Sequence, residues 1–297
     1  MKTITKYPLL FALMGLAMLA GCKKHKKNDI TTNNKPTNPI TVTAVCDYDV
    51  SDTALTNHGW TKAFDDEFSG TLSNWTAITG GVEKELECNE PANAQIVNGV
   101  LQITAKQQTV TGPKTVGNDT TQSFNYTSAW LVSNMAFSAN VNTPKVRIVA
   151  RIKVASGYGL TSLFYGFGGN WPTNGEIDYM GVQGNDTKEY ATTYDFGTQV
   201  NKNEVSGALL YNPTTEDLSA CYHIYTMEWT QSALNSYLDG KLVEAKTAGG
   251  HVGDLFGKSH TLALSLPIGG LYYSSLNTAN VQGGTLYVDY VKVFTSN

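Results

Sequence analysis

Two carboxylates, Glu176 and Asp178, stand two residues apart in the stretch Trp171–Gly181. If the stretch is a β-strand, both project from one face, and Ile177 and Tyr179 point to the other. Two carboxyl groups on one wall of a cleft suit the cleavage of a glycosidic bond, because one attacks or stabilises the sugar and another protonates the departing oxygen. Such a pair can also belong to a solvated strand face. The glycine-rich run before it and the neighbouring Trp-Pro favour a site.

The stretch reads Trp171-Pro-Thr-Asn-Gly-Glu-Ile-Asp-Tyr-Met-Gly181 and resembles the catalytic strand of glycoside hydrolase family 16, the laminarinase-like β-glycanases. The family pattern there is Trp-Pro, a short gap, and Gly-Glu-Ile-Asp-Ile-Met-Glu. Its first Glu is the nucleophile, its Asp holds and tunes that Glu, and its last Glu is the general acid/base. The resemblance therefore implies that Glu176 is the nucleophile and Asp178 its helper. Gly181 stands where the acid/base should be.

The resemblance covers about residues 58–297 and rests on further segments in the expected order. They are Asp66-Glu67-Phe68, Tyr126-Thr127-Ser128-Ala129, Val149-Ala150-Arg151-Ile152-Lys153, Tyr225-Thr-Met-Glu228-Trp229, Leu238-Asp239-Gly240 and Tyr287–Phe294. The departures gather at positions that face the glycan in the family: Trp130 replaces an Arg, and the segments 84–89 and 265–270 differ from the usual Asn-Glu-Leu-Gln-Tyr-Tyr and Asn-Leu-Ala-Val-Gly-Gly. The framework positions match a glycanase, whereas the positions that face the glycan differ.

A regular strand would place Gly181 on the face opposite to Glu176. The resemblance implies a one-residue bulge that turns position 181 back toward the cleft. Neither Gly181 nor Met180, which would face the cleft without the bulge, can donate a proton. Four carboxylates near motif segments are candidate replacements for the acid, or else solvated or framework charges: Glu85, Glu87, Asp195 and Glu228.

Aromatic residues border the cleft in the family, where sugar rings stack on them. The resemblance places these residues there, although aromatics at strand spacing are also ordinary core residues: Trp130, Tyr165, Trp171, Tyr194, Tyr272 and Tyr273. For Trp171 we favour the groove. For Trp229 and Phe294 we expect the core.

The elements that must position these residues are short alternating strands with turn signals and no sustained helical period. Asn98-Gly99 and Asp239-Gly240 are hairpin turn signals. Many strands and few helices predict an all-β, two-sheet β-sandwich. The resemblance specifies a concanavalin A-like jelly roll of two antiparallel sheets with a concave glycan cleft.

The 297 residues divide into three expected parts. Residues 1–22 have a positive start and a short apolar run, which predict a removable export signal. Its end, Leu19-Ala-Gly-Cys22, resembles a bacterial lipobox, so Cys22 is the expected lipidation site; an ordinary signal peptide is the alternative. Residues 23–43 begin with a lysine cluster and read as a flexible tether. Residues 44–297 form the β-sandwich domain, and we expect it at the bacterial cell envelope on a lipid anchor.

Charge and cysteine content limit the partners. A net charge of −4 and a pI near 5.7 give no basic field for nucleic acid. With Cys22 lipidated, three of the four cysteines remain, and we favour a Cys46–Cys221 disulfide with Cys88 free. The histidines lack metal-ligand spacing. We expect a monomer that needs no cofactor, although the resemblance implies a structural calcium site at Glu67 and Asp289.

Three functions remain open. The first is a glycan-binding protein on a family 16 fold, anchored at the envelope, with lost or strongly reduced hydrolysis. The second is an active retaining endo-β-glucanase, acting on a 1,3- or 1,3-1,4-linked β-glucan, with Glu176 as nucleophile and another acid. The third is altered chemistry that uses a different acid or an activated substrate. Position 181 favours the first.

Overall fold

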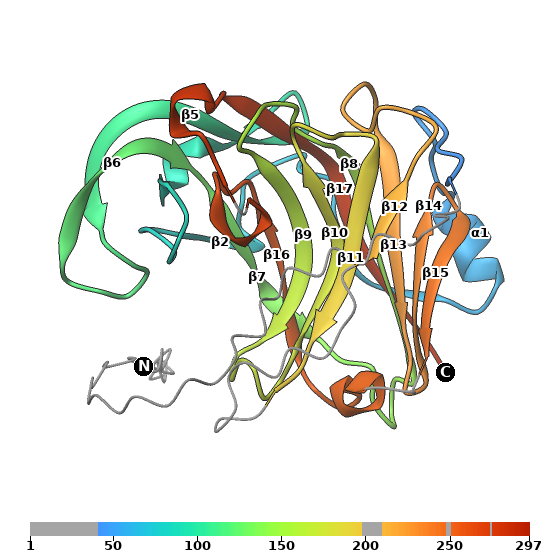
Figure 1. Cartoon of the computed structure of the whole chain (residues 1–297). Coiled ribbons are helices and arrows are strands. Elements are labelled where there is room, and N and C mark those ends of the chain that lie inside the picture. Colours follow the sequence, from blue (N-terminus) through green and yellow to red (C-terminus); the bar gives the residue numbers. More distant parts are fainter. Residues whose placement is uncertain (1–40, 198–209, 248–250, 274) are drawn as a thin grey trace, which may run out of the picture. The chain divides into compact units, whose positions relative to one another are not determined.

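In the computed structural model, residues 41–197, 210–247, 251–273 and 275–297 are described. They form strands joined by turns and a few short helices (Figure 1). The strands are β1 (Thr61–Asp66), β2 (Trp75–Ile78), β3 (Glu87–Asn89), β4 (Ala94–Val97), β5 (Val100–Pro113), β6 (Thr121–Ser128), β7 (Trp130–Phe137), β8 (Lys145–Lys153), β9 (Thr161–Gly168), β10 (Glu176–Gln183), β11 (Glu189–Asp195), β12 (Leu210–Pro213), β13 (His223–Trp229), β14 (Ala233–Leu238), β15 (Lys241–Thr247), β16 (His260–Ser265) and β17 (Gly284–Ser296). The helices are α1 (Asp52–Asn57) and the 3-10 turns η1 (Pro91–Asn93), η2 (His251–Leu255), η3 (Gly270–Tyr272) and η4 (Thr278–Asn280).

The described strands form two sheets. The ten-stranded sheet follows the order β15-β14-β13-β8-β17-β5-β6-β3, with β1 on β17 and β4 on β5. The seven-stranded sheet follows the order β12-β11-β10-β9-β16-β7-β2 and carries the candidate site on β10. Every pairing between these strands is antiparallel except β3 with β6. The predicted all-β sandwich is confirmed.

The core lies between the sheets and consists of the residues that each strand turns inward. In β9, buried Phe164 alternates with the less buried neighbours Leu163 and Tyr165. Trp229 of β13 is fully buried, as predicted. Because alternate side chains of a strand point to opposite faces, the residues of β9 and β10 that do not enter the core are free to build a site on the other face.

The two hairpin turns predicted from the sequence are present. Asn98 and Gly99 both have positive φ (52° and 76°) and join β4 to β5, the geometry of a two-residue hairpin. Asp239 and Gly240 do the same between β14 and β15.

A second, smaller apolar cluster lies under helix α1. Leu55 of α1 packs there with residues of the ten-stranded sheet: Val149, Ile224, Tyr290 and Phe294. Phe294 is therefore buried, as predicted.

The disulfide pairs Cys46 with Cys221, as predicted, with 5.5 Å between their Cα atoms. It ties the segment before α1 to the start of β13. Cys88 is a buried free thiol. Cys22 and most of the predicted tether lie outside the described residues. Within the described ranges, no helix has the length and apolar character that a membrane crossing requires.

Candidate active site

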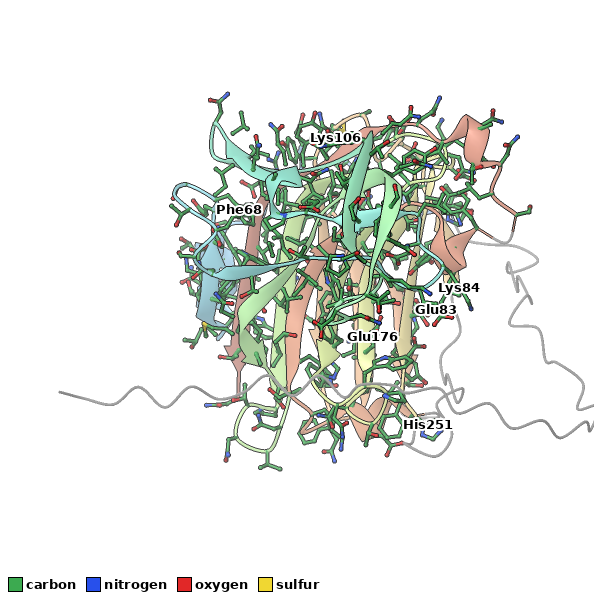
Figure 2. The ribbon with its side chains drawn as sticks, turned by 90° about the vertical axis from the view of Figure 1, so that its left-hand side faces the viewer. Phe68, Glu83, Lys84, Lys106, Glu176 and His251 are labelled. Atoms are coloured by element: carbon green, nitrogen blue, oxygen red, sulfur yellow. A yellow bond between two sulfur atoms is a disulfide. The ribbon has the colours of Figure 1, made fainter. Side chains whose placement is uncertain are left out.

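Strand β10 places Glu176 and Asp178 on one face of the seven-stranded sheet, here called the Glu176 face. Glu176 pairs with Phe167 on β9, and Asp178 pairs with Tyr165. Ile177 lies between the two carboxyl residues and is fully buried in the core. Figure 2 shows Glu176 near the middle of the molecule, below the segment that carries Glu83 and Lys84.

A β-bulge interrupts β10 just after Asp178. Asp178 pairs with Tyr165 of β9 but Met180 pairs with Phe164, so Tyr179 is an additional residue in β10. Tyr179 and Met180 both enter the core. Gly181 then pairs with Leu163, which lies on the same face of β9 as Tyr165. The expected bulge is present, and it brings Gly181 onto the Glu176 face, where the acid/base would stand.

Glu176 and Asp178 form a hydrogen-bonded dyad. Burial and the neighbouring Glu176 charge raise the pKa of Asp178 well above its usual range, so Asp178 keeps its proton and donates it to Glu176 in a hydrogen bond. Burial and the Asp195 carboxylate raise the pKa of Glu176 to about 7, against the effect of hydrogen bonds from Asp178 and Trp171. In this dyad Asp178 is therefore protonated, and Glu176 ionises near neutral pH.

A third carboxyl, Asp195, lies directly opposite Glu176 on β11. Residues directly opposite in an antiparallel pair have Cβ atoms about 4.5–5.5 Å apart, so the two side chains leave the sheet side by side. Burial raises the pKa of Asp195 to about 6, and its Oδ1 has no hydrogen-bond partner in the described part of the chain. The sequence offered Asp195 only as one of several carboxylates. Its place beside Glu176 depends on the register of β10 and β11.

Three aromatic rings form a continuous row near the dyad. Trp130 of β7 lies 6.2 Å from Phe167 of β9, and Phe167 lies 5.8 Å from Tyr165, centroid to centroid. The Tyr165 hydroxyl forms a hydrogen bond with Ser265 and lies near the negative charges of Glu176 and Glu85. Sequence reasoning named Trp130 and Tyr165 but missed Phe167, whose signal was the alternation Leu163, Tyr165, Phe167 along one face.

Three of the other four aromatic residues that the resemblance placed at the cleft have different positions. Trp171 is 43% exposed and donates its indole N–H to Glu176, so it orients the Glu176 carboxylate as well as bordering the site. Tyr272 lies against Gly181, since a Cβ built on that glycine would be 3.5 Å from the Tyr272 hydroxyl. Tyr194 is a correction: it pairs with Ile177 and is buried in the core on the opposite face of the sheet.

The remaining candidate acids differ in their surroundings. Glu228 belongs to the other sheet, where it pairs with Arg147 at 2.7 Å. Glu87 is fully buried and accepts a hydrogen bond from the Ile268 N–H. Glu85 hydrogen-bonds Glu87, and burial raises the pKa of both carboxyls. Glu85 borders the site near Tyr165, whereas Glu87 and Glu228 serve the framework.

The residues predicted to hold calcium already have cations of the chain as partners. Glu67 pairs with Lys292 at 2.9 Å, and Asp289 pairs with Arg151 at 2.7 Å. Among the described residues, no three His, Cys, Asp or Glu side chains form a cluster that could hold a metal ion. Calcium also binds backbone carbonyl oxygens and waters, so the calcium site stays a prediction.

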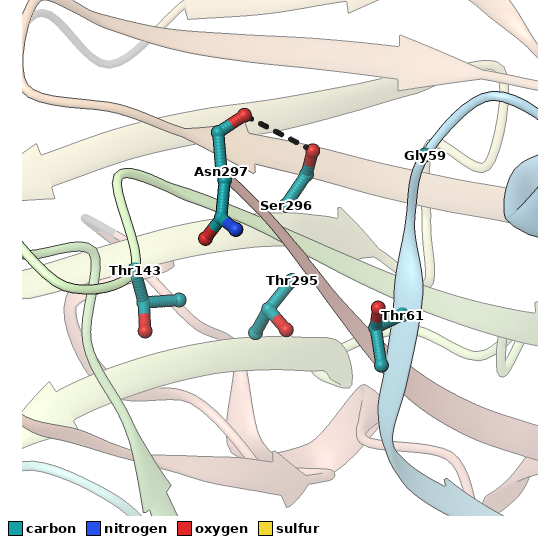
Figure 3. Close-up of a pocket in the computed structure, with 6 residues that line it drawn as sticks. All are labelled: Gly59, Thr61, Thr143, Thr295, Ser296 and Asn297. Carbon is teal, nitrogen blue, oxygen red and sulfur yellow. Dashed lines mark hydrogen bonds between the residues drawn. The ribbon is translucent and has the colours of Figure 1, made fainter.

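A polar hollow lies elsewhere, at the end of β17. It is lined by small polar residues and glycine (Figure 3): Gly59, Thr61, Thr143, Thr295, Ser296 and Asn297. None of these side chains titrates near neutral pH. The hollow is therefore no rival to the Glu176 face as a chemical site.

Comparison with known proteins identifies the family of this chain. Residues 87–292 match the family model "Glycosyl hydrolases family 16". Over 79% of its length the chain is 27% identical to the clotting factor G alpha subunit of Tachypleus tridentatus, and over 80% it is 25% identical to glucan endo-1,3-beta-glucosidase A1 of Niallia circulans. It covers only 34% and 38% of those two proteins.

Solved structures share the fold. The endo-beta-1,3-glucanase of Pyrococcus furiosus matches with a TM-score of 0.67 and 26% identity, over 80% of this chain and 95% of that one. The laminarinase catalytic domain of Thermotoga maritima matches with a TM-score of 0.66 and 23% identity, over 80% and 99%. With the dyad, the bulge and a family match over most of its length, the chain belongs to glycosyl hydrolase family 16.

Proposed function

We propose that this protein binds a β-glucan-type polysaccharide on the Glu176 face and hydrolyses ordinary glycosidic bonds at no more than a trace rate. One observation carries the proposal. The bulge in β10 brings position 181 onto the face of Glu176 and Asp178, and the residue there is Gly181. The nucleophile and its helper are present, and the group that should protonate the leaving oxygen is absent from that position.

The missing acid matters more than the retained nucleophile. A general acid typically contributes about 10²–10⁴ in rate, or roughly 3–5 kcal/mol of barrier. Glu176 can still attack the anomeric carbon while the bond between that carbon and the leaving oxygen breaks. Without a proton, however, the leaving group must depart as an alkoxide, which is a poor leaving group. Only sugars with an anionic leaving group of low basicity avoid this cost.

The nearby carboxyls do not replace the acid. Asp195 stands beside Glu176 on the next strand, whereas the acid should stand further along β10, beyond Asp178. Glu85 belongs to the segment 84–87 and is engaged with Glu87. Neither carboxyl lies at the position of residue 181, so the geometry of a family 16 acid is not reproduced.

The binding half of the proposal rests on the aromatic row and the partly buried carboxyls. Aromatic faces such as those of Trp130, Phe167 and Tyr165 suit the apolar faces of sugar rings. Glu176 and Asp195 can accept hydrogen bonds from sugar hydroxyls. Two of the relatives are described as glucanases acting on 1,3-linked β-glucan, which supports a β-glucan as the first ligand to test. We further propose a monomer held at the bacterial envelope by lipidated Cys22.

The experiment compares binding and cleavage on the same protein. Binding to laminarin, lichenan and agar is measured by calorimetry or affinity electrophoresis, and hydrolysis by reducing-sugar release. We expect binding of at least one glucan, trace hydrolysis, and release of fluoride from a glycosyl fluoride that disappears in Glu176→Ala. Rapid release of sugars from laminarin by the native protein would refute the proposal.

The alternative is an active retaining endo-β-glucanase. The observation in its favour is the intact dyad, in which Asp178 and Trp171 both donate hydrogen bonds to Glu176. In that case a carboxyl outside position 181 must act as the acid, and Asp195 and Glu85 are the first to test. Laminarin hydrolysis that is lost in Asp195→Asn or Glu85→Gln would establish this alternative.

A further inference from the structure

The turn between β16 and β17 places Tyr272 over Gly181. A Cβ built on Gly181 would lie 3.5 Å from the Tyr272 hydroxyl oxygen and 3.6 Å from its Cε1. It would also lie 3.3 Å from Cδ2 of Leu163. The Cβ would be in tight contact with Leu163, which must give way by a few tenths of an ångström, and in ordinary contact with Tyr272. The remaining atoms of a glutamate side chain would have to enter space that the Tyr272 ring already borders.

Strand β10 and the segment 84–87 fix this turn. Gln183, which follows Gly181 on the same face, donates a hydrogen bond from Nε2 to the Tyr272 carbonyl oxygen at 2.5 Å. The Gly270 N–H donates to the Lys84 carbonyl at 3.2 Å. Tyr273, the residue after Tyr272, donates its hydroxyl to the Leu160 carbonyl at 2.8 Å. Because residues on both sides of Tyr272 form these hydrogen bonds, moving Tyr272 away from Gly181 would break several of them.

The backbone at Gly181 does not itself require glycine. Its φ lies outside the left-handed region, unlike those of Gly269 and Gly270 in the turn opposite, at 78° and 74°. A larger residue at 181 is therefore limited by its neighbours rather than by its own conformation. The neighbour whose ring and hydroxyl lie at that point is Tyr272.

We propose that Tyr272 is a specificity-determining residue that occupies the place of the missing acid and contacts the bound glycan there. The inference rests on the proposed function and extends it. A tyrosine hydroxyl can donate a hydrogen bond, so Tyr272 can hold a glycan oxygen at the place where the family has a carboxylic acid. The ring adds an apolar surface beside the dyad. Tyr272 thus converts a position for bond cleavage into a position for binding.

The first test measures binding of laminarihexaose by calorimetry in Tyr272→Phe and Tyr272→Ala. Loss of one hydrogen bond predicts about 2- to 10-fold weaker binding for the Phe variant, and loss of the ring predicts a larger decrease for the Ala variant. Tyr287→Phe is the matched control, because Tyr287 lies in the other sheet against Lys153. If both Tyr272 variants bind as tightly as the native protein, the inference is wrong while the proposed function stands.

The second test restores the acid. We expect Gly181→Glu alone to gain no laminarin hydrolysis and to lower the thermal midpoint, because its side chain competes with Tyr272 for space. Gly181→Glu combined with Tyr272→Ala should hydrolyse laminarin about 10²-fold faster than Gly181→Glu. Equal rates in the single and double variants would show that Tyr272 does not exclude the acid. Native hydrolysis at a high rate would instead refute the proposed function, whatever the Tyr272 variants do.

Discussion

The pH dependence of an activated substrate gives the sharpest test of the site. Laminaribiosyl fluoride releases fluoride, which needs no proton, so the first step, in which Glu176 displaces fluoride and forms the glycosyl-enzyme, depends on the ionised form of Glu176 alone. Burial and the Asp195 charge raise the pKa of Glu176 to about 7. About one tenth of Glu176 is then ionised at pH 6 and about nine tenths at pH 8. We expect kcat/KM to rise about tenfold across this range and then remain level.

Laminarin tests for the acid, because its leaving oxygen needs a proton. With a complete acid and nucleophile pair, kcat/KM on laminarin falls again at high pH as the acid loses its proton, which produces a bell. Any trace rate of the native protein on laminarin should have a rising limb only, because position 181 carries no acid. A descending limb on laminarin above pH 8, with the protein still folded, would refute the absence of an acid from the site.

Neighbours of Glu176 should move the midpoint of this rise in opposite directions. Asp195→Asn removes a negative charge beside Glu176 and should shift the midpoint to lower pH, because the ionised form becomes less costly. Trp171→Phe removes an N–H donor to the carboxylate and should shift it to higher pH. Asp119→Asn, at an exposed position in the β5–β6 loop, is the matched control. An unchanged midpoint in both site variants would refute the assigned electrostatics.

Further predictions concern stability, binding and location. The folded-state pKa of Glu176, about 7, exceeds its ordinary value of 4.5, so native stability should fall as pH rises between these values. Glu176→Gln lacks this titration. The difference between its thermal midpoint and that of the native protein should therefore shift in favour of the variant from pH 5 to pH 8. Removing the Cys46–Cys221 disulfide by serine substitutions should lower the free energy of unfolding by about 2–4 kcal/mol in urea titrations. Trp130→Ala should weaken glucan binding in calorimetry without changing the pH midpoint of fluoride release. Cys22→Ala should move the protein from the membrane fraction to the soluble fraction, and equal amounts in both would argue against a lipid anchor.

The sequence predicted the features that depend on neighbouring residues. The spacing of Glu176 and Asp178 gives one face to both carboxyls in any strand, because side chains alternate. The Asn98-Gly99 turn follows from the ability of these residues to adopt positive φ. The family pattern around Gly181 implied the bulge, which the pairing of β9 with β10 confirms.

One expectation failed because it depended on contacts between distant segments. The resemblance placed Tyr194 at the cleft, but the register of β11 pairs it with Ile177 and buries it. The local pattern does not set the register of a strand. It also does not show that Lys292 and Arg151 lie beside Glu67 and Asp289.

By itself, the sequence determined the β-sandwich class, the dyad and the absence of a carboxyl at position 181, since each is a matter of residue type and local spacing. Only the tertiary structure decided what surrounds these residues. The antiparallel register of β10 and β11 brings Asp195 beside Glu176, and the turn after β16 brings Tyr272 to the space in front of Gly181. Residues far apart in the chain meet there because sheet order and turn geometry, rather than sequence distance, determine which side chains share a volume.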